Sequence, residues 1–440
     1  MSEMEEEMVV SSSDTDDDTE DAGNKEVPDE KKEVYLPGKP LEEGEELVCD
    51  QTAYVMLHQA QTGAPCLSFD IIHDNLGQNR ETFPLTTYIV AGTQAQQNHV
   101  NNVVVMKLHN LHQTSKENKD EEDDELSDEE DEFQQPKMAA ALIKHQGGVN
   151  RIRSYVYEEI NLAASWSELG RVNIWNLTEQ LQAVDNPQLL TSYNNQNKSN
   201  SAKPAFTFSG HQKEGFAIDW CTTMPGVLAT GDCRRDIHIW KPAESKNWIV
   251  DQRPLIGHTD SVEDLQWSPN ERNVLASCSV DRSVRIWDTR AAPSQACMLT
   301  ASDAHTNDVN VISWNKNEPF ILSGGDDGFL HVWDLRKFQQ KTPVATFKHH
   351  MGPITTVEWH PTDSAVFASG GADNQIALWD LSVEKDSELS AEEIDGLPPQ
   401  LLFIHQGQNN IKELHWHPQL TSVIISTAES GFNIFRTISV

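Results

Sequence analysis

Histidine, serine, aspartate and tryptophan recur at nearly constant spacing along the chain. Histidines at positions 145, 211, 258, 305, 350 and 405 each precede an aromatic residue, at 175, 240, 287, 333, 379 or 435, by 28 to 30 residues. Histidine near a carboxylate could act as a catalytic base or a metal ligand. An active site needs such a set once, whereas six evenly spaced copies are typical of a structural hydrogen-bond network in a repeat protein. We therefore predict no catalytic residue, no metal site, no cofactor and no enzymatic activity.

The most regular copy of this pattern predicts which side chains form the network. Its members are His258, Ser277, Asp281 and Trp287. The next two copies provide Asp327 and Trp333, then Asp373 and Trp379. At the aspartate position, the copies that end at Trp175 and Trp240 carry Leu169 and Arg234, so we expect those two units to be less regular. We also assign a structural role to His415 and His417.

The repeats themselves indicate short strands. The stretches "RSVRIWD", "GFLHVWD" and "NQIALWD" end at Asp288, Asp334 and Asp380, at a period of 46 residues. Alternating Val, Ile and Trp between turn residues is strand chemistry, and four strands per unit of this length predict the blades of a propeller. We predict an all-β, seven-bladed β-propeller whose first blade lies in residues 50–144. The chain ends after the third strand of its last blade, so Ala53–His58 should supply the fourth and close the ring.

The charge is concentrated in three segments. The formal net charge is −36, and residues 1–50, 117–132 and 384–395 contribute −15, −11 and −5 of it. We predict a disordered acidic arm at 1–50, a propeller at 51–440, an acidic loop at 114–136 in blade one and an acidic proline-proline loop at 383–400 in blade six. Such segments favour basic partners and disfavour nucleic acid and anionic membranes. We expect no direct nucleic-acid binding and no membrane contact.

The N-terminus and the cysteines also limit the class of protein. The start "MSEMEEEMVVSSSDTDDD" has neither the basic nor the apolar region of a signal peptide. No apolar run approaches the roughly 18 residues of a membrane span. The six cysteines show no paired short spacing, which favours reduced intracellular thiols over disulfides or a zinc site.

The three acidic segments should meet on one face. Loops between strands three and four lie on the same face of every blade, and the acidic loops of blades one and six and the arm entering the closing strand all occupy this position. We therefore predict a three-part acidic clasp around blade seven. The carboxylates predicted to bind a partner in blade one are Asp120, Glu121, Glu122, Asp123, Asp124, Glu125, Asp128, Glu129, Glu130, Asp131 and Glu132. Ser13 and Ser127 precede acidic residues and are candidate phosphorylation sites.

Selectivity requires an apolar, shaped element, because exposed ion pairs contribute roughly 0 to 1 kcal/mol each. The segment "GLPPQLLF" holds two prolines beside leucines. We predict that Asp395, Leu397, Pro398, Pro399 and Leu402 line a partner-binding groove, although the leucines could instead belong to the strand core.

These motifs resemble known families. "SGH", "IGH" and the Trp-Asp pairs are similar to WD repeats, and the acidic proline-proline segment resembles the loop of the histone chaperones related to retinoblastoma-binding proteins. There, the loop and an N-terminal helix hold a histone helix, but residues 1–46 here show no amphipathic helix of useful length. The stretches "GAPCLSFDII", "YIVAGTQA" and "FNIFRTISV", with the acidic loop, more closely resemble the glutamate-rich WD-repeat proteins.

That resemblance implies a function and a location. It suggests a nuclear and nucleolar chaperone for ribosomal protein three of the large subunit, with histones as alternative partners. A third alternative is a substrate receptor that docks on the adaptor of a cullin-RING ubiquitin ligase. It depends on two Trp-Asp-x-Arg boxes, whose characteristic residues are Asp288 and Arg290, and Asp334 and Arg336.

Overall fold

Four-stranded antiparallel sheets form nearly all of the regular structure. The computed structural model describes residue 35 and residues 47–95, 101–114, 135–197, 202–244, 247–383 and 397–440. Contacts divide the chain into two units, Met1–Val48 and Cys49–Val440, and the strands of the seven sheets all belong to the second. The predicted count of seven blades is confirmed.

The strands of each blade run from the innermost to the outermost. Blade one contains β2 (Cys66–Ile72), β3 (Leu85–Thr93), β4 (Asn102–Leu111) and β5 (Lys137–Lys144). Blade two contains β6 (Val149–Tyr157), β7 (Ile160–Ser167), β8 (Arg171–Asn176) and β9 (Phe206–Phe208). Blade three contains β10 (Ala217–Trp220), β11 (Leu228–Gly231), β12 (Ile237–Pro242) and β13 (Trp248–Val250). Blade four contains β14 (Val262–Trp267), β15 (Val274–Ser279), β16 (Val284–Asp288) and β17 (Cys297–Ala301).

The remaining three blades follow the same order. Blade five contains β18 (Val309–Trp314), β19 (Phe320–Gly325), β20 (Phe329–Asp334) and β21 (Ala345–Lys348). Blade six contains β22 (Ile354–Trp359), β23 (Val366–Gly371), β24 (Ile376–Asp380) and β25 (Leu401–His405). Blade seven contains β26 (Glu413–Trp416), β27 (Ile424–Ala428), β28 (Gly431–Thr437) and β1 (Tyr54–Ala60). The innermost strands of consecutive blades contact one another, and β2 contacts β26, so the ring is closed.

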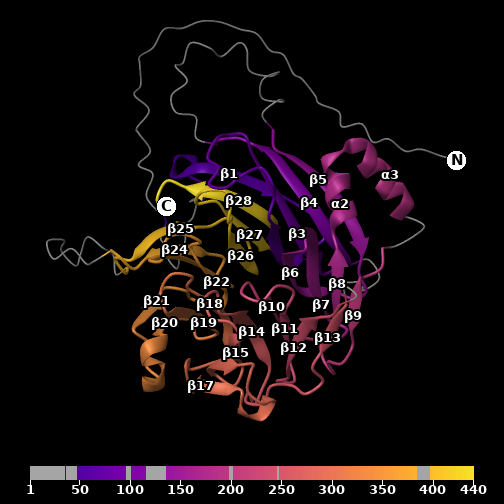
Figure 1. The fold of residues 1–440 in the computed structure, drawn as a ribbon. Coiled ribbons are helices and arrows are strands. Elements are labelled where there is room, and N and C mark those ends of the chain that lie inside the picture. The colour runs from indigo at the N-terminus through magenta and orange to yellow at the C-terminus, as the bar shows by residue number, and fades with distance from the viewer. Residues whose placement is uncertain are drawn as a thin grey trace, which may run out of the picture. The chain divides into compact units, whose positions relative to one another are not determined.

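The N-terminal strand completes the last blade, as predicted. Strand β1 pairs antiparallel with β28, with Tyr54 opposite Thr437 and Ala60 opposite Phe432. Figure 1 shows indigo β1 beside yellow β28. Without β1, the outer edge of β28 would present unpaired backbone groups. The two ends of the described propeller therefore hold each other in place.

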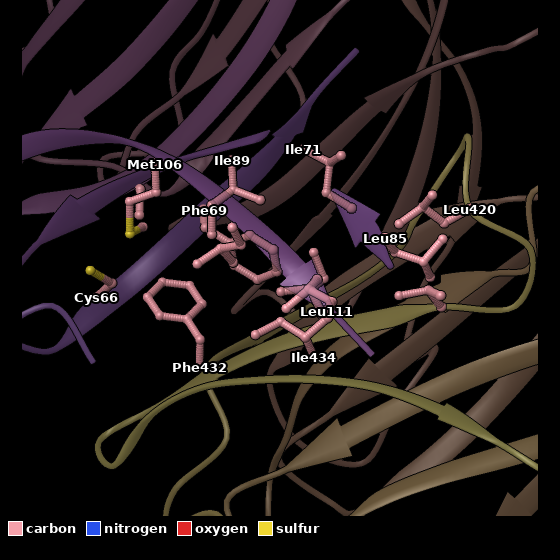
Figure 2. Close-up of a cluster of buried hydrophobic side chains, with 14 of the residues drawn as sticks. Cys66, Phe69, Ile71, Leu85, Ile89, Met106, Leu111, Leu420, Phe432 and Ile434 are labelled. Carbon is pink, nitrogen blue, oxygen red and sulfur yellow. The ribbon is translucent and has the colours of Figure 1, made fainter. Parts of the chain in front are cut away.

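Apolar packing closes the same joint. Figure 2 shows Phe69 and Met106 of blade one near Phe432 and Ile434 of blade seven, and all four belong to one buried cluster. The rings of Phe69 and Phe432 meet edge to face, with centroids 5.5 Å apart. Successive side chains of a strand point to opposite faces of the sheet, and both faces are covered by neighbouring blades, so single strands read as mostly apolar. The first and last blades are thus joined by side chains as well as by backbone hydrogen bonds.

The predicted network residues of blade four are bonded to one another. His258 Nε2 lies 2.7 Å from Ser277 Oγ, and Trp287 Nε1 donates to the same hydroxyl at 2.8 Å. His258 Nδ1 lies 2.9 Å from Asp281 Oδ2. Blades five and six repeat this pattern through Asp327 and Asp373. These hydrogen bonds connect the second and third strands of a blade to the loop that precedes its first strand.

The units expected to be irregular depart from the pattern in different ways. In blade three, Asp232 takes the carboxylate position and lies 2.8 Å from His211, although Arg234 occupies the expected position. In blade two, His145 Nδ1 instead contacts the Gly147 carbonyl oxygen at 2.9 Å. In blade seven, the Tyr54 hydroxyl lies 2.8 Å from His405 Nδ1. A backbone carbonyl or a phenol thus replaces the carboxylate where the motif is weak.

Two helices that the strand periodicity does not predict lie between β8 and β9. They are α2 (Thr178–Asp185) and α3 (Pro187–Asn197), and both contact β5 of the neighbouring blade one. Asp185 Oδ1 accepts hydrogen bonds from the Tyr88 hydroxyl at 2.6 Å and from Lys107 Nζ at 2.8 Å. The insertion therefore braces the outer strands of blade one.

All six cysteines are free thiols. Among the described residues, no helix has the length and apolar character needed to cross a membrane.

Candidate functional site

The described ends of two acidic segments meet at β1. Thr114 directly precedes the undescribed residues 115–134, and its Oγ1 accepts the Leu57 N–H at 2.7 Å. Its own N–H donates to the Val55 carbonyl at 3.0 Å. Strand β1 itself follows the acidic N-terminal arm in the sequence. Thr114 and the described residues that precede β1 in the sequence therefore lie at the same strand.

The strand that follows the proline-proline segment packs against β1 as well. The rings of Tyr54 and Phe403 meet edge to face, with centroids 5.4 Å apart. Leu402, Phe403 and Leu57 all pack against the buried hydrophobic cluster that contains Tyr54. Strand β25, which follows the third acidic segment, thus packs against β1 where blade six meets blade seven.

The proline-proline segment is itself half-buried. Leu397, Pro398 and Pro399 are each partly exposed, and the Leu401 N–H donates to the Pro398 carbonyl at 3.0 Å. Leu402 is partly buried against the core between blades six and seven, which favours the strand-core interpretation for this residue. Leu397 to Pro399 remain as the apolar surface next to the acidic segments.

Some predicted site residues lie outside the described residues. They are Ser13, Ser127, Asp395 and the blade-one carboxylates at 120–125 and 128–132. Only the anchors of their segments are placed by the structure.

The two Trp-Asp-x-Arg boxes lie after the third strands of blades four and five. Arg290 Nη2 lies 2.6 Å from Asp288 Oδ2, and Arg336 Nε lies 2.9 Å from Asp334 Oδ1. Both guanidinium side chains are exposed, at 69% and 65%. The boxes occupy the strand-three to strand-four position, so they lie on the same face as Thr114, which follows the third strand of blade one.

An ion cluster in the centre of the ring joins blades two, six and seven. Glu413 Oε1 lies 2.8 Å from Arg151 Nη1 and 2.7 Å from Arg153 Nη2. His415 Nδ1 lies 2.8 Å from Glu358 Oε2. Sequence reasoning missed this cluster because Arg151 and Glu413 are 262 residues apart. The only local signal was charge on innermost strands that are otherwise apolar.

Electrostatics keeps this cluster ionised. Burial opposes ionisation of Glu413, but Arg153 and Arg151 outweigh it and hold the pKa of this carboxyl well below its usual range. Burial also disfavours the charged form of His415, yet Glu358 and Glu413 raise its pKa to about 10. His415 is therefore a cation at neutral pH, and the cluster has opposite charges paired in a buried position.

Within the described residues, one group could by proximity hold a metal ion, namely His305, Asp327 and His331. His305 uses Nδ1 with Asp327 at 3.0 Å and Nε2 with Ser323 Oγ at 2.8 Å. Burial and the neighbouring His305 lower the pKa of His331 to about 4. Both nitrogens of His305 serve the blade network, so we assign this group a structural role.

This architecture defines the class of protein. A closed ring of seven four-stranded blades with repeated His, Ser and Trp bonds is a WD-repeat β-propeller, and residues 250–288, 296–334 and 341–380 match the family described as "WD domain, G-beta repeat". Residues 44–112 match the family of the histone-binding protein RBBP4 and its counterpart in the CAF1 complex. This second match covers the closing strand β1 of blade seven and strands β2 to β4 of blade one.

Relatives narrow the family. "Protein HEAT STRESS TOLERANT DWD 1" of Arabidopsis thaliana is 43% identical, covering 94% of this chain and 93% of its own. "Ribosome assembly protein rrb1" of Schizosaccharomyces pombe is 40% identical, covering 92% and 84%. "Glutamate-rich WD repeat-containing protein 1" of Dictyostelium discoideum is 43% identical, covering 92% and 85%. The chain belongs to this family of glutamate-rich WD-repeat proteins, as its sequence motifs indicated.

Proposed function

We propose that this protein is a non-enzymatic chaperone that holds a strongly basic client, a large-subunit ribosomal protein, during ribosome assembly. The observation that carries the proposal is that described residues flanking the acidic segments lie at β1. Thr114 and Leu57 are bonded there, and Leu402 packs in the adjacent cluster. Supporting evidence comes from the relative named for ribosome assembly.

Charge explains why such a client would need this protein. An unassembled ribosomal protein binds RNA phosphates without sequence selectivity, and its affinity depends on salt. A surface of net negative charge competes for the same basic residues and is displaced when the client reaches its site on ribosomal RNA. The net charge of −36 on this chain provides that competition. Phosphates on Ser13 or Ser127 would strengthen it.

Selectivity is assigned to the apolar surface beside the acidic segments. Exposed ion pairs contribute only roughly 0 to 1 kcal/mol each and are screened by salt. Leu397, Pro398 and Pro399 provide a partly exposed apolar surface with restricted backbone. In the proposal, Asp120 to Glu132 and Asp395 attract the client. The apolar surface of Leu397, Pro398 and Pro399 selects it. The site of action would be the nucleus and its nucleolus.

A charge-neutralised variant tests the proposal. All acids from Asp120 to Glu132 are changed to Asn or Gln in the full chain, and a second variant keeps these acids in shuffled order. Binding to purified large-subunit ribosomal protein three is measured from 50 to 300 mM salt. We expect the neutralised variant to lose about tenfold in affinity, with a shallower salt dependence. The shuffled variant should bind like wild type; equal affinity of the neutralised variant would refute the clasp.

Histones are a second candidate client, supported by the match of residues 44–112. Histones and the ribosomal protein should be compared in the same assay, at equal concentration and salt. Tighter binding of histones would replace the first client with the second. The clasp mechanism would be unchanged, because both clients are basic.

A ligase-adaptor function is favoured by a different observation, the two exposed arginines on one face. The double variant Arg290→Ala, Arg336→Ala should abolish capture of a cullin-RING adaptor if this alternative is right. Arg282→Ala is the matched control, because Arg282 is also exposed and paired with an aspartate, Asp303, but lies between strands two and three. If the wild-type protein captures no cullin-RING adaptor, this function is excluded.

A further inference from the structure

A cavity of about 530 Å³ lies at the ends of the innermost strands of blades one, two and three. Its lining includes Asp70 of β2, Arg153 and Tyr155 of β6, and Asp219 and Trp220 of β10. A volume of this size is in the range of sites for small ligands or single side chains with their water. It lies apart from the joint at β1 and has no role in the function proposed above.

The cavity lies at the face on which β4, the strand that leads to Thr114, ends. In a four-stranded antiparallel blade, the first and third strands run in the same direction. The ends of β2, β6 and β10 therefore point to the same side as the end of β4, which leads to Thr114 and the acidic residues 117–132. A client held by those residues would pass over the mouth of this cavity.

Two carboxylates, Asp70 and Asp219, and one guanidinium, Arg153, line the cavity, and within the described residues neither carboxylate forms an ion pair. Asp70 Oδ2 accepts the Ser154 N–H at 2.6 Å and the Ser154 hydroxyl at 3.0 Å. Asp219 Oδ2 accepts the Trp267 N–H at 2.7 Å, and no described residue donates to its Oδ1. Arg153 also lines the cavity, but its Nη2 donates to Glu413 Oε1 at 2.7 Å, in the ion cluster at the centre of the ring. Negative charge thus remains in the cavity.

Burial and the surrounding charges change the pKa of Asp219. Burial raises the pKa of the Asp219 carboxyl to about 7; the Trp267 N–H and Arg153 oppose this shift, and the carboxylates of Asp264 and Asp70 add to it. An additional cation nearby would favour the ionised form of this carboxyl and offset the effect of burial.

An aromatic pair forms one wall. The rings of Tyr155 and Trp220 are stacked, with centroids 5.2 Å and planes 16° apart. Trp220 Nε1 donates to the Arg153 carbonyl at 3.1 Å, which fixes the orientation of the indole. Carboxylates next to aromatic rings suit an organic cation, because the rings attract positive charge and pack against an aliphatic stem. A bare metal ion would gain nothing from this wall.

We propose that this cavity takes one lysine or arginine side chain from an extended segment of the basic client. The inference rests on the proposed function and adds a point of recognition to it. Asp70 and Asp219 meet the charged group, and Tyr155 and Trp220 meet the stem. The acidic segments supply attraction at long range, and the cavity fixes the register of the client on this face.

The test uses the full chain and a fluorescein-labelled dodecapeptide of alternating lysine and glycine at physiological salt. Asp219→Asn removes the charge and keeps an oxygen that can accept the Trp267 N–H. Asp363→Asn is the matched control, because Asp363 is an exposed acid in the strand-one to strand-two loop of blade six, on the same face. We expect Asp219→Asn to weaken binding about tenfold and Asp363→Asn to weaken it less than twofold.

Proton release provides a second readout that a purely structural role would not change. A bound cation favours the ionised form of Asp219, so wild type should release up to about half a proton per peptide at pH 7. Titration calorimetry in two buffers of different ionisation enthalpy measures this release, which should vanish in Asp219→Asn.

The outcomes separate the two proposals. If Asp219→Asn binds within twofold of wild type while neutralising residues 120–132 weakens binding, the cavity proposal is overturned and the clasp stands. If wild type binds the lysine peptide no better than a glutamine-glycine peptide, the proposed function fails, and the cavity proposal fails with it.

Discussion

Thr114 Oγ1 accepts the backbone N–H of Leu57 at 2.7 Å, although the two residues are 57 positions apart in the chain. This bond ties the beginning of the blade-one acidic segment to the closing strand of blade seven. The Thr114 N–H donates in turn to Val55, on the same strand. The strand that closes the ring therefore also holds Thr114, the last described residue before the blade-one acidic segment.

Removing the Thr114 hydroxyl should loosen this joint. Thr114→Val leaves the Leu57 N–H without its acceptor and should lower the free energy of unfolding by about 1 kcal/mol. Hydrogen exchange at Leu57 should become faster than in wild type. Thr362→Val, at an exposed threonine, is the control and should change neither quantity. Unchanged exchange at Leu57 would show that the bond does not anchor the strand.

Breaking the central ion cluster should be costly. Glu413→Gln removes the carboxylate that Arg151 and Arg153 share and leaves two buried guanidiniums without their partner. Loss of one partner of a buried pair typically costs about 3–5 kcal/mol, so we expect a loss in that range by urea denaturation. Glu429→Gln, at an exposed glutamate, should cost less than about 0.5 kcal/mol. A loss below about 1 kcal/mol for Glu413→Gln would contradict the role of the cluster.

Stability should fall as the pH rises above neutrality because of His415. The pKa of this imidazole is raised to about 10 in the folded state, against an unfolded value near 6.5. The folded state therefore binds the proton more tightly, and this contribution is complete below pH 6.5 and lost as the pH rises through 10. Denaturation at pH 7 and 8.5 should show a decline of at least about 1 kcal/mol. His415→Gln should be less stable and should lack most of this slope; an equal slope would assign it to other groups.

Removing one network hydroxyl should weaken a single blade. Ser277→Ala deletes the group that contacts both His258 and Trp287, and both of these side chains are buried. Two buried polar groups then lose a partner, so the free energy of unfolding should fall by about 2 kcal/mol. Ser192→Ala, on the exposed face of α3, should have little effect. Near-UV circular dichroism should report the change in the environment of Trp287.

Much of the fold could be predicted because its signals are local. Side chains alternate along each strand, and the same pattern returns every 46 residues in successive blades. The last repeat contains only three strands, which indicated that another segment supplies the outer strand of blade seven. The helices α2 and α3 escaped prediction because "TEQLQAVDNPQLLTSYNNQN" is largely polar and interrupts the strand period. Tertiary contacts with β5 and the bonds of Asp185 stabilise them.

The sequence by itself determined the number of blades and the concentration of negative charge in three segments, because strand periodicity and charge are properties of neighbouring residues. The closing strand followed from the number of strands in the last blade. Only the tertiary structure decided that Thr114 meets Leu57, that Arg153 serves Glu413 instead of Asp219, and that Leu402 packs into the core. Hydrogen bonds, Coulomb forces and packing act over a few ångströms in space. Residues hundreds of positions apart can therefore define a site that no local pattern reveals.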